Sequence, residues 1–302
     1  MLNAALYLTT VLIWGSTWLA IKYQIGEVPP IQSILYRFAI AAFLLQGFVL
    51  VTGRFTWFDR RAHLLFLALG AFLFSMNYLL YYIAVELGLT TGLEAVIFSF
   101  LIVLNIVNAW ILFGERPQGV VVIGAAFGLI GVGMLFRNEL QDVLTGTTIG
   151  IAVLLSVGAT YLASLGNMAS RALQARKVDV VSANAWGMTY GTGILLVGSL
   201  VTTDAFVFSA TPTYIGCLLF LAVFGTIIAF GAYLTLLGRI GSARASYATI
   251  VFPIIALILS TIFENYEWSA LKTAGVAMIA SGNLILLGRF PKFLRPEPAG
   301  DS

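Results

Sequence analysis

The feature that most constrains this chain is a series of long apolar runs, because each is long enough to cross a membrane as a helix. A bilayer-spanning helix needs about 20 mainly apolar residues. Barrel strands are disfavoured because they are about ten residues long and alternate in polarity, whereas these runs are longer and continuous. The apolar runs cover residues 3–21, 31–52, 62–85, 89–113, 118–136, 147–170, 180–201, 213–237, 242–263 and 270–288. The sequence therefore predicts an all-α integral membrane protein with ten transmembrane helices.

Composition supports this fold class and limits the chemistry. Hydrophobic residues make up 60% of the 302 residues and charged residues only 10%, whereas about a quarter of a soluble domain is charged. The chain has one cysteine, Cys217, and one histidine, so an intrachain disulfide and a cysteine-cluster metal site are excluded. We expect no bound metal and no cofactor.

The distribution of positive charge predicts the orientation. Ten helices place both termini on one side, and Lys and Arg collect on the cytoplasmic side of membrane proteins. With cytoplasmic termini, the outer segments hold only Lys22, Arg137 and Lys272, while Arg37 lies inside the second helix. The inner segments then hold Arg54, Arg60, Arg61, Arg116, Arg171, Arg176, Lys177, Arg239, Arg244, Arg289, Lys292 and Arg295. Both termini are therefore predicted to be cytoplasmic.

A block of sequence occurs twice, at 92–134 and 241–285. An offset of 149 aligns Gly92 with Gly241 and Glu115 with Glu264. A period near half the chain length indicates two copies of one unit. Each copy has five helices, an odd number, so the second copy must enter the membrane from the opposite side. We predict two inverted-topology repeats, at 1–138 and 146–290, followed by a disordered cytoplasmic tail at 291–302. Transporters use such repeats to build a site near the bilayer midplane.

Several short motifs resemble those of a known family. They are the Trp14-Gly15-Ser16 segment, Arg37, and the two blocks that end in Glu115 and Glu264. Together they resemble the drug/metabolite transporter superfamily, and within it the ten-helix branch built from two EamA-type repeats. The resemblance covers about residues 3–288 and is closest to the bacterial amino-acid exporters, including those for aromatic amino acids.

This resemblance implies a multi-pass exporter of small metabolites in the bacterial inner membrane. It also implies a substrate cavity between helices 1, 3, 4, 6, 8 and 9, with helices 5 and 10 at the periphery. One departure concerns Pro253, because the equivalent position of the first copy is Leu104. Proline frees a backbone carbonyl and allows a helix to kink. A symmetric kink in helix 4 is therefore not expected.

Polar and aromatic residues at helical spacing indicate which faces line the cavity. A helix that faces only lipid needs no polar stripe. Ser and Thr in such stripes can also join helices by hydrogen bonds, and Trp and Tyr can serve packing, so each candidate has a structural alternative. The candidate cavity residues are Trp14, Thr17, Ser75, Tyr78, Tyr82, Glu94, Phe98, Thr160, Asn167, Tyr233 and Pro253.

Four charged residues carry further hypotheses. Arg37 and Glu94 are the two charges inside helices. They are expected to pair in the outer leaflet, or Glu94 couples transport to protons. Glu115 and Glu264 each precede a helix, and a carboxylate there is favoured by the helix dipole. They are therefore expected to cap the helices at 118–136 and 270–288.

The chain lacks a phosphate-binding loop and the common hydrolase motifs, so we expect neither ATP hydrolysis nor any other enzymatic activity. The sequence therefore predicts a secondary transporter that exports amino acids by alternating access. Its transport would proceed by uniport, exchange or proton coupling. Alternative substrates are drugs or other metabolites. Nucleotide sugars and sugar phosphates are disfavoured because only Arg37 lies within a helix. An intramembrane enzyme is a distant alternative.

The expected partners are the small-molecule substrate and the lipid bilayer, with no nucleic acid. The chain is expected to be a monomer or a weak homodimer. The Gly124-x-x-x-Gly128 pattern permits a close helix approach, which favours packing within the chain over dimerisation.

Overall fold

The structure is a computed structural model, and it describes residues 2–115, 119–135, 148–203, 205–240 and 248–287. Within these ranges every regular element is a helix and none is a strand. The α-helices are α1 (Leu2–Lys22), α2 (Pro30–Val51), α3 (Arg60–Ala71), α4 (Asn77–Glu86), α5 (Thr91–Ser99), α6 (Leu101–Phe113), α7 (Gly119–Leu135), α9 (Thr148–Ala175), α10 (Val180–Thr202), α11 (Pro212–Phe220), α12 (Ala229–Ile240), α14 (Ala248–Phe263) and α15 (Ala270–Leu287). Two π-helices, η1 (Phe72–Met76) and η2 (Leu221–Ile228), continue α3 into α4 and α11 into α12.

The helices coincide with the predicted apolar runs, and most ends agree within three residues. The run at 147–170 is an exception, because its helix continues to Ala175. The start of the run at 242–263 and the predicted tail lie outside the described residues. Within the described ranges, six helical stretches are long and apolar enough to cross a membrane: Leu2–Lys22, Pro30–Val51, Arg60–Glu86, Thr91–Phe113, Thr148–Ala175 and Pro212–Arg239.

Local sequence explains several helix starts. The side chain of Asp59 accepts a hydrogen bond from the backbone nitrogen of Ala62 at the start of α3. Asp179 does the same for Ser182 in α10. These are the contacts through which Asp caps the free backbone donors of a first turn. Pro30 and Pro212 stand at the first position of α2 and α11, where the missing N–H of proline costs nothing.

The two π-helices begin 149 residues apart, which is the offset of the repeated block. In each, a hydroxyl donates to the carbonyl five residues before it: Ser75 to Gly70 at 3.0 Å, and Thr226 to Leu221 at 2.8 Å. A π-turn rotates the side chains that follow it and often lies at a functional site. These segments therefore redirect the helices that reach the centre of the molecule.

The helix breaks do not follow proline. The segment Thr91–Phe113 is interrupted at Phe100, whose nitrogen bonds to the carbonyl of Ile97 in a tighter turn. By contrast, α14 is continuous through Pro253. The helix of the first copy is therefore interrupted without a proline. The equivalent helix of the second copy contains Pro253 and is continuous.

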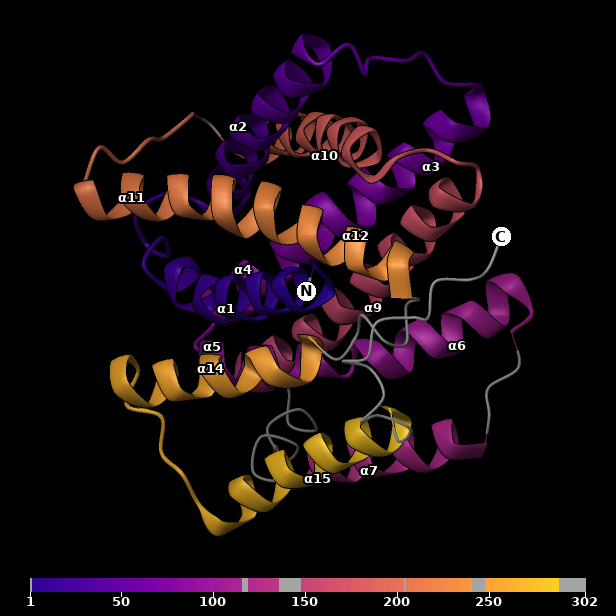
Figure 1. Cartoon of the computed structure of the whole chain (residues 1–302). Helices are drawn as coiled ribbons and strands as arrows, with labels where there is room; N and C mark the ends of the chain where they lie inside the picture. Colours follow the sequence, from indigo (N-terminus) through magenta and orange to yellow (C-terminus); the bar gives the residue numbers. More distant parts are fainter. Residues whose placement is uncertain (1, 116–118, 136–147, 204, 241–247, 288–302) are drawn as a thin grey trace.

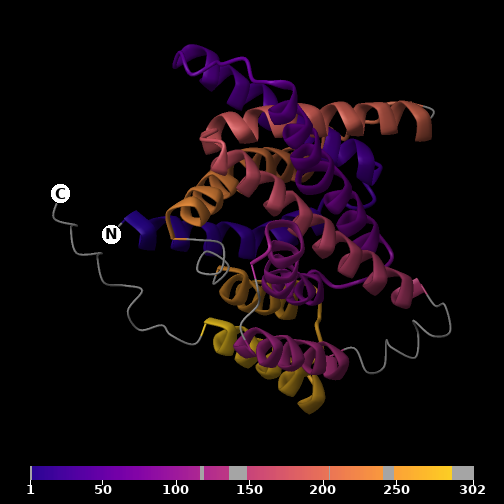
Figure 2. The ribbon, with the colours of Figure 1, turned by 90° about the vertical axis from the view of Figure 1, so that its right-hand side faces the viewer.

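In space, α1 runs through the middle of the molecule, with α2, α3 and α10 on one side and α14 on the other (Figure 1). The pair α7 and α15 lies together beyond α14 at the edge (Figures 1 and 2). Glycines hold this pair close: a Cβ on Gly131 would lie 2.7 Å from the Gly275 carbonyl, and one on Gly282 would lie 2.6 Å from that of Gly124. The glycines of the repeated block thus serve packing within the chain.

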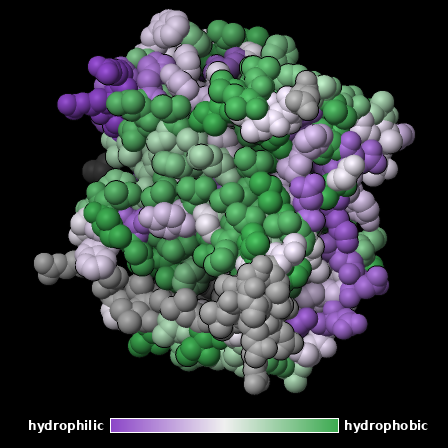
Figure 3. Space-filling model, turned by 180° about the vertical axis from the view of Figure 1, so that it is seen from behind, coloured by the Kyte–Doolittle hydropathy of each residue, from purple (hydrophilic) through white to green (hydrophobic). Residues whose placement is uncertain are grey.

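The outer surface is apolar over wide areas. Figure 3 shows hydrophobic side chains over most of one face, with hydrophilic ones gathered toward its edges. Phe43 and Val201 are each 79% exposed and Val51 is 89% exposed. Water does not tolerate so much apolar surface on a monomer, whereas lipid chains cover it without cost.

Candidate functional site

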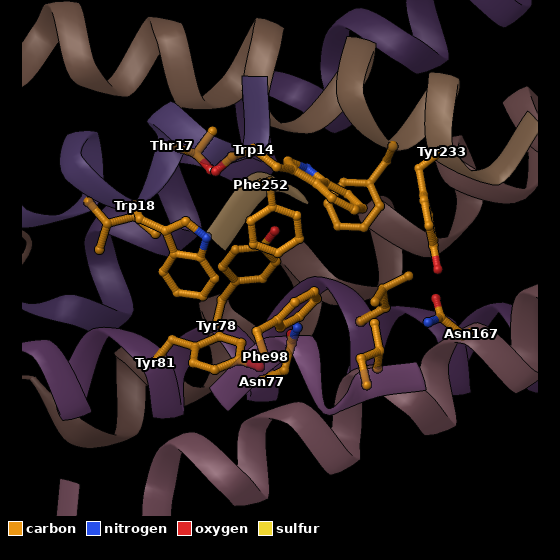
Figure 4. Close-up of a pocket in the computed structure, with 14 residues that line it drawn as sticks. Trp14, Thr17, Trp18, Asn77, Tyr78, Tyr81, Phe98, Asn167, Tyr233 and Phe252 are labelled. Atoms are coloured by element: carbon orange, nitrogen blue, oxygen red, sulfur yellow. The ribbon is translucent and has the colours of Figure 1, made fainter. Parts of the chain in front are cut away.

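A cavity lies at the centre of the molecule, where helices from both halves of the chain meet (Figure 4). The space between its wall atoms, open space at its mouth included, amounts to about 500 Å³. Its walls come from α1, η1, α4, α5, α6, α9, α12 and α14. The lining residues are Trp14, Thr17, Trp18, Ile21, Leu73, Asn77, Tyr78, Tyr81, Phe98, Leu101, Asn167, Phe230, Tyr233 and Phe252.

Aromatic rings dominate the walls and hold one another in place. The ring centroid of Trp14 lies 4.9 Å from that of Tyr233 and 5.0 Å from that of Phe230. Trp18 meets Tyr81 edge to face at 5.2 Å. Aromatic pairs at these separations and tilts stabilise each other beyond simple area burial. The cavity is therefore a box of fixed rings suited to an apolar or aromatic group.

The indole of Trp14 is anchored by η2, because its Nε1 donates to the Gly225 carbonyl at 3.3 Å. The π-turn leaves this carbonyl available to a side chain from α1. The link joins residues 211 positions apart in the chain. The two halves are therefore tied together at the cavity wall.

Polar atoms at the cavity are few and include two unpaired acceptors. The amide oxygens of Asn77 and Asn167 are buried and have no hydrogen-bond partner among the described residues. The nitrogen of Asn167 donates to the Asn105 oxygen at 3.4 Å. In Figure 4, Trp18 and Tyr81 stand at one end of the cavity, and Tyr233 and Asn167 at the other. A ligand with a donor group finds acceptors here without needing a carboxylate.

Six of the eleven candidate residues lie on the cavity, and five lie elsewhere. Trp14, Thr17, Tyr78, Phe98, Asn167 and Tyr233 line it. The Ser75 hydroxyl is satisfied by the Gly70 carbonyl, and the Tyr82 hydroxyl by Gln24 Oε1 at 2.8 Å. Thr160 lies behind the wall, with its hydroxyl 2.9 Å from that of Tyr81. Pro253 lines a separate apolar crevice between α5, α14 and α15.

Sequence reasoning missed Trp18, Ile21, Leu73, Asn77, Tyr81, Leu101, Phe230 and Phe252 on the cavity wall. Most of them are apolar or aromatic. In a chain this apolar, residue type alone does not distinguish a cavity-lining residue from a core residue. Asn77 carried a usable signal, since a buried amide in a spanning helix needs a partner.

The expected Arg37–Glu94 pair is not formed. The Arg37 Nε donates to Thr226 at 2.8 Å, and its Nη2 donates to the Tyr78 hydroxyl at 3.4 Å. Glu94 is fully buried, and neither carboxyl oxygen has a hydrogen-bond partner among the described residues. It lies on α5 between Phe98, which lines the cavity, and Thr91 at the helix start. The pairing was wrong because spacing along a helix does not show which neighbour each side chain faces.

Beyond Ile21, which lines the cavity, α1 ends in a contact that we call the clasp, made of Lys22, Thr91 and Glu264. The Lys22 Nζ lies 3.2 Å from the Glu264 carboxylate. The same carboxylate accepts from the Thr91 hydroxyl at 2.6 Å and from its backbone nitrogen at 3.2 Å. The Glu264 side chain is only 2% exposed. Glu264 therefore caps α5 and not α15 as expected, and it joins α1, α5 and the end of α14.

The other end of the cavity has a looser arrangement. Arg171 of α9 binds Glu115, just beyond α6, through two hydrogen bonds, one of them 3.0 Å long. Both side chains are substantially exposed, Glu115 by 56%. The Arg171 guanidinium holds the pKa of Glu115 below its ordinary value. Deeper in, the Asn108 amide donates to the Ser164 hydroxyl at 2.8 Å.

These two ion pairs are related by position. Lys22 and Arg171 are 149 residues apart, and so are Glu115 and Glu264. Each pair joins the end of the first helix of one sequence copy to the glutamate of the other copy. Equivalent residues therefore meet at opposite ends of the cavity.

No group of three or more His, Cys, Asp or Glu side chains that would hold a metal occurs among the described residues. The arrangement offers instead a rigid aromatic box, two free amide oxygens and a charged contact at each end. These features suit binding and passage of a ligand.

A family profile and a solved structure both match most of the chain. The sequence profile of the EamA-like transporter family matches the chain twice, at residues 1–137 and 150–288. A solved structure titled only "Crystal structure of protein" shares the fold, with a TM-score of 0.70 at 17% identity over 95% of this chain and 98% of its own.

Curated relatives match over most of their length. The protein named "Probable amino-acid metabolite efflux pump" of Escherichia coli K12 is 23% identical, covering 93% of both chains. An uncharacterized inner membrane transporter of the same strain is 26% identical, covering 92% of this chain and 89% of its own. An uncharacterized transporter of Bacillus subtilis is 27% identical, covering 91% and 93%.

Proposed function

Because the chain belongs to the EamA-like transporter family, we propose that it is a secondary transporter that exports amino acids, including aromatic ones. It is a multi-pass protein of the bacterial inner membrane. The observation that carries the substrate class is the aromatic box with two amide oxygens that have no hydrogen-bond partner among the described residues. An aromatic or aliphatic amino acid has an apolar side chain for the rings and an ammonium group for the acceptors. The name of the Escherichia coli relative supports the same class.

The proposed topology has ten spans in two inverted repeats, at 1–138 and 146–290, with both termini in the cytoplasm. The excess of Lys and Arg in the inner segments supports this orientation. The double match of the family profile and the shared offset of 149 support the repeats. In this orientation the clasp faces the outside, and the Arg171–Glu115 pair faces the cytoplasm.

The proposed mechanism is alternating access, in which the cavity opens to one side at a time. In this mechanism the clasp, whose Glu264 carboxylate is buried, holds α1, α5 and α14 together and so keeps the outer end closed. Breaking it frees α5 and α14 to move apart at that end. The exposed Arg171–Glu115 pair takes the equivalent part at the inner end. The aromatic rings of the cavity keep their contacts with the substrate while the ion pair at one end forms and the ion pair at the other end breaks.

Proton coupling through Glu94 is a second candidate for the energy source, against uniport or exchange. Its motivation is that the carboxyl is fully buried and unpartnered, on the face of α5 that joins the clasp to the cavity. A buried carboxyl without a partner is expected to hold a proton and to release it when water reaches it. If so, Glu94→Gln abolishes proton-gradient-driven flux and keeps substrate exchange in proteoliposomes. Unchanged gradient dependence in Glu94→Gln excludes this coupling.

The test of the function is uptake into proteoliposomes, screened over the twenty amino acids and a set of cationic dyes. We expect uptake of apolar and aromatic amino acids, and a strong loss in Phe98→Ala, which opens the box. Phe43→Ala is the matched control, because Phe43 is 79% exposed on the lipid-facing side of α2. If only the dyes are taken up, the substrate is a drug and not an amino acid. No stimulation by any compound would overturn the function.

A further inference from the structure

Arg37 is a buried cation with no counter-ion in the part of the chain that the structure describes. It lies in α2 and is 1% exposed. No carboxylate within the described residues lies within ion-pair distance of its guanidinium, and its Nη1 has no hydrogen-bond partner there. Arginine stays charged in proteins, and a charge inside a membrane protein is costly unless it is paired. A persistent cost of this kind indicates a transient partner of opposite charge.

The guanidinium is fixed directly behind the cavity wall. Its central carbon lies 4.4 Å from the centre of the Tyr78 ring, and its Nε is held by Thr226 of η2 at 2.8 Å. Tyr78 lines the cavity, and so does Thr17. Gly225 separates Thr17 from the cation: a Cβ there would lie 2.7 Å from Thr17 Cγ2 and 3.5 Å from Arg37 Nη2. One layer of side chain thus separates the charge from the ligand space.

The Tyr78 hydroxyl connects the charge to the cavity. Its oxygen accepts the 3.4 Å hydrogen bond from Arg37 Nη2, so its own proton is available to donate. A hydroxyl that accepts from a cation becomes a stronger donor, because hydrogen bonds in a chain polarise one another. Donors backed by a positive charge favour a carboxylate as acceptor.

We propose that Arg37 and Tyr78 form the subsite for the carboxylate of the substrate, with Tyr78 donating and Arg37 supplying the missing countercharge. The adjacent Asn77 and the more distant Asn167 offer amide oxygens to an ammonium group. The cavity therefore selects free carboxylic acids with an apolar body over their amides and esters. This deepens the proposed function, since it assumes that the cavity binds the transported metabolite.

The test measures binding to the purified full-length protein with a series of ligands that differ in one group. Phenylalanine and 3-phenylpropanoate carry the carboxylate, while phenylalaninamide and 3-phenylpropanamide do not. Calorimetry on each gives the ratio of amide to acid Kd. For the native protein we expect a ratio of roughly 10 or more, as a charge-assisted hydrogen bond implies. Tyr78→Phe keeps the ring over Arg37, so its ratio should fall toward 1.

Tyr214→Phe is the matched control, because it removes a buried phenol that lies 3.0 Å from the Ser33 hydroxyl and does not line the cavity. Its ratio should stay at the native value. Arg37→Gln should also lower the ratio of amide to acid Kd. If Arg37→Gln fails to fold, the result for Tyr78→Phe decides the question. Equal affinity for acids and amides in the native protein, or a native ratio in Tyr78→Phe, would overturn the subsite.

The two proposals fail differently in this assay. If 3-phenylpropanoate binds with the expected ratio but no amino acid binds or is transported, the amino-acid function falls and the carboxylate subsite stands. If phenylalanine and its amide bind alike, the subsite falls and the transport function stands. If no compound with a carboxylate binds, the subsite is also overturned.

Discussion

The two ion pairs at the ends of the cavity use equivalent sequence positions but lie in different surroundings. The Glu264 side chain is 2% exposed and holds Lys22 together with the start of α5, whereas the Glu115 side chain is 56% exposed and holds Arg171. An exposed ion pair contributes little stability, because water and salt screen it. A buried carboxylate that accepts several hydrogen bonds is costly to disturb. The contact at the Glu264 end of the cavity should therefore be the harder of the two to break.

The comparison predicts its largest effect at Glu264. In Glu264→Ala the Thr91 donors and Lys22 lose their shared acceptor, so we expect a loss of about 1–3 kcal/mol. The measurement is thermal unfolding in detergent, where Tm should fall by several degrees. Glu115→Ala is the control, and its Tm should change by much less. Equal losses in the two variants would mean that burial does not distinguish the pairs.

A smaller effect is expected at Thr91, which separates the cap of α5 from the ion pair. Thr91→Val removes the 2.6 Å hydrogen bond from its hydroxyl to Glu264 and leaves Lys22 in place. We expect a loss of about 1 kcal/mol. Lys22→Met should cost less, because the Lys22 side chain is 40% exposed. If Lys22→Met loses more stability than Thr91→Val, the ion pair contributes more to the clasp than the hydrogen bond from Thr91.

The smallest effect is expected at Glu115, and it depends on pH. Its pKa is lowered in the folded protein by Arg171, so the pair stabilises above the ordinary carboxyl pKa. That contribution is lost as the pH falls through the lowered pKa. Unfolding measured from pH 7 into the acid range should show native and Glu115→Gln converging at low pH. High salt should also reduce their difference, and a difference that grows in acid would contradict the assignment.

The fold was predictable from sequence where a single property decides it. Uninterrupted hydrophobicity places the helices, since a spanning segment has few alternatives. The break at Phe100 was not predictable, because it follows no proline or glycine. The repeat pointed to Glu115 and Glu264, but their partners depend on helices brought together by the fold. Lys22 is 242 residues from Glu264, and no local rule links them.

The site was only partly predictable for a related reason. Tyr78 and Trp14 stood out because large amphipathic rings inside a membrane need a special environment. Phe230 and Phe252 share the same cavity but look like any core residue. Arg37 was recognised as unusual, yet its expected partner was wrong, because the rotation of α2 relative to α5 decides which side chain it meets. Charge alone identified the residue, and only packing identified its role.

The central claim is that the clasp closes the outer end of the cavity, and accessibility from outside tests it directly. Ile21 lines the cavity beside Lys22 and is 2% exposed. In a Cys217→Ala background, Ile21→Cys is labelled with an impermeant maleimide on intact cells. The account predicts slow labelling with the clasp intact and labelling faster by roughly tenfold or more when Glu264→Gln is added, as the loss of charge-assisted hydrogen bonds implies. Equal labelling rates with and without Glu264→Gln would contradict it.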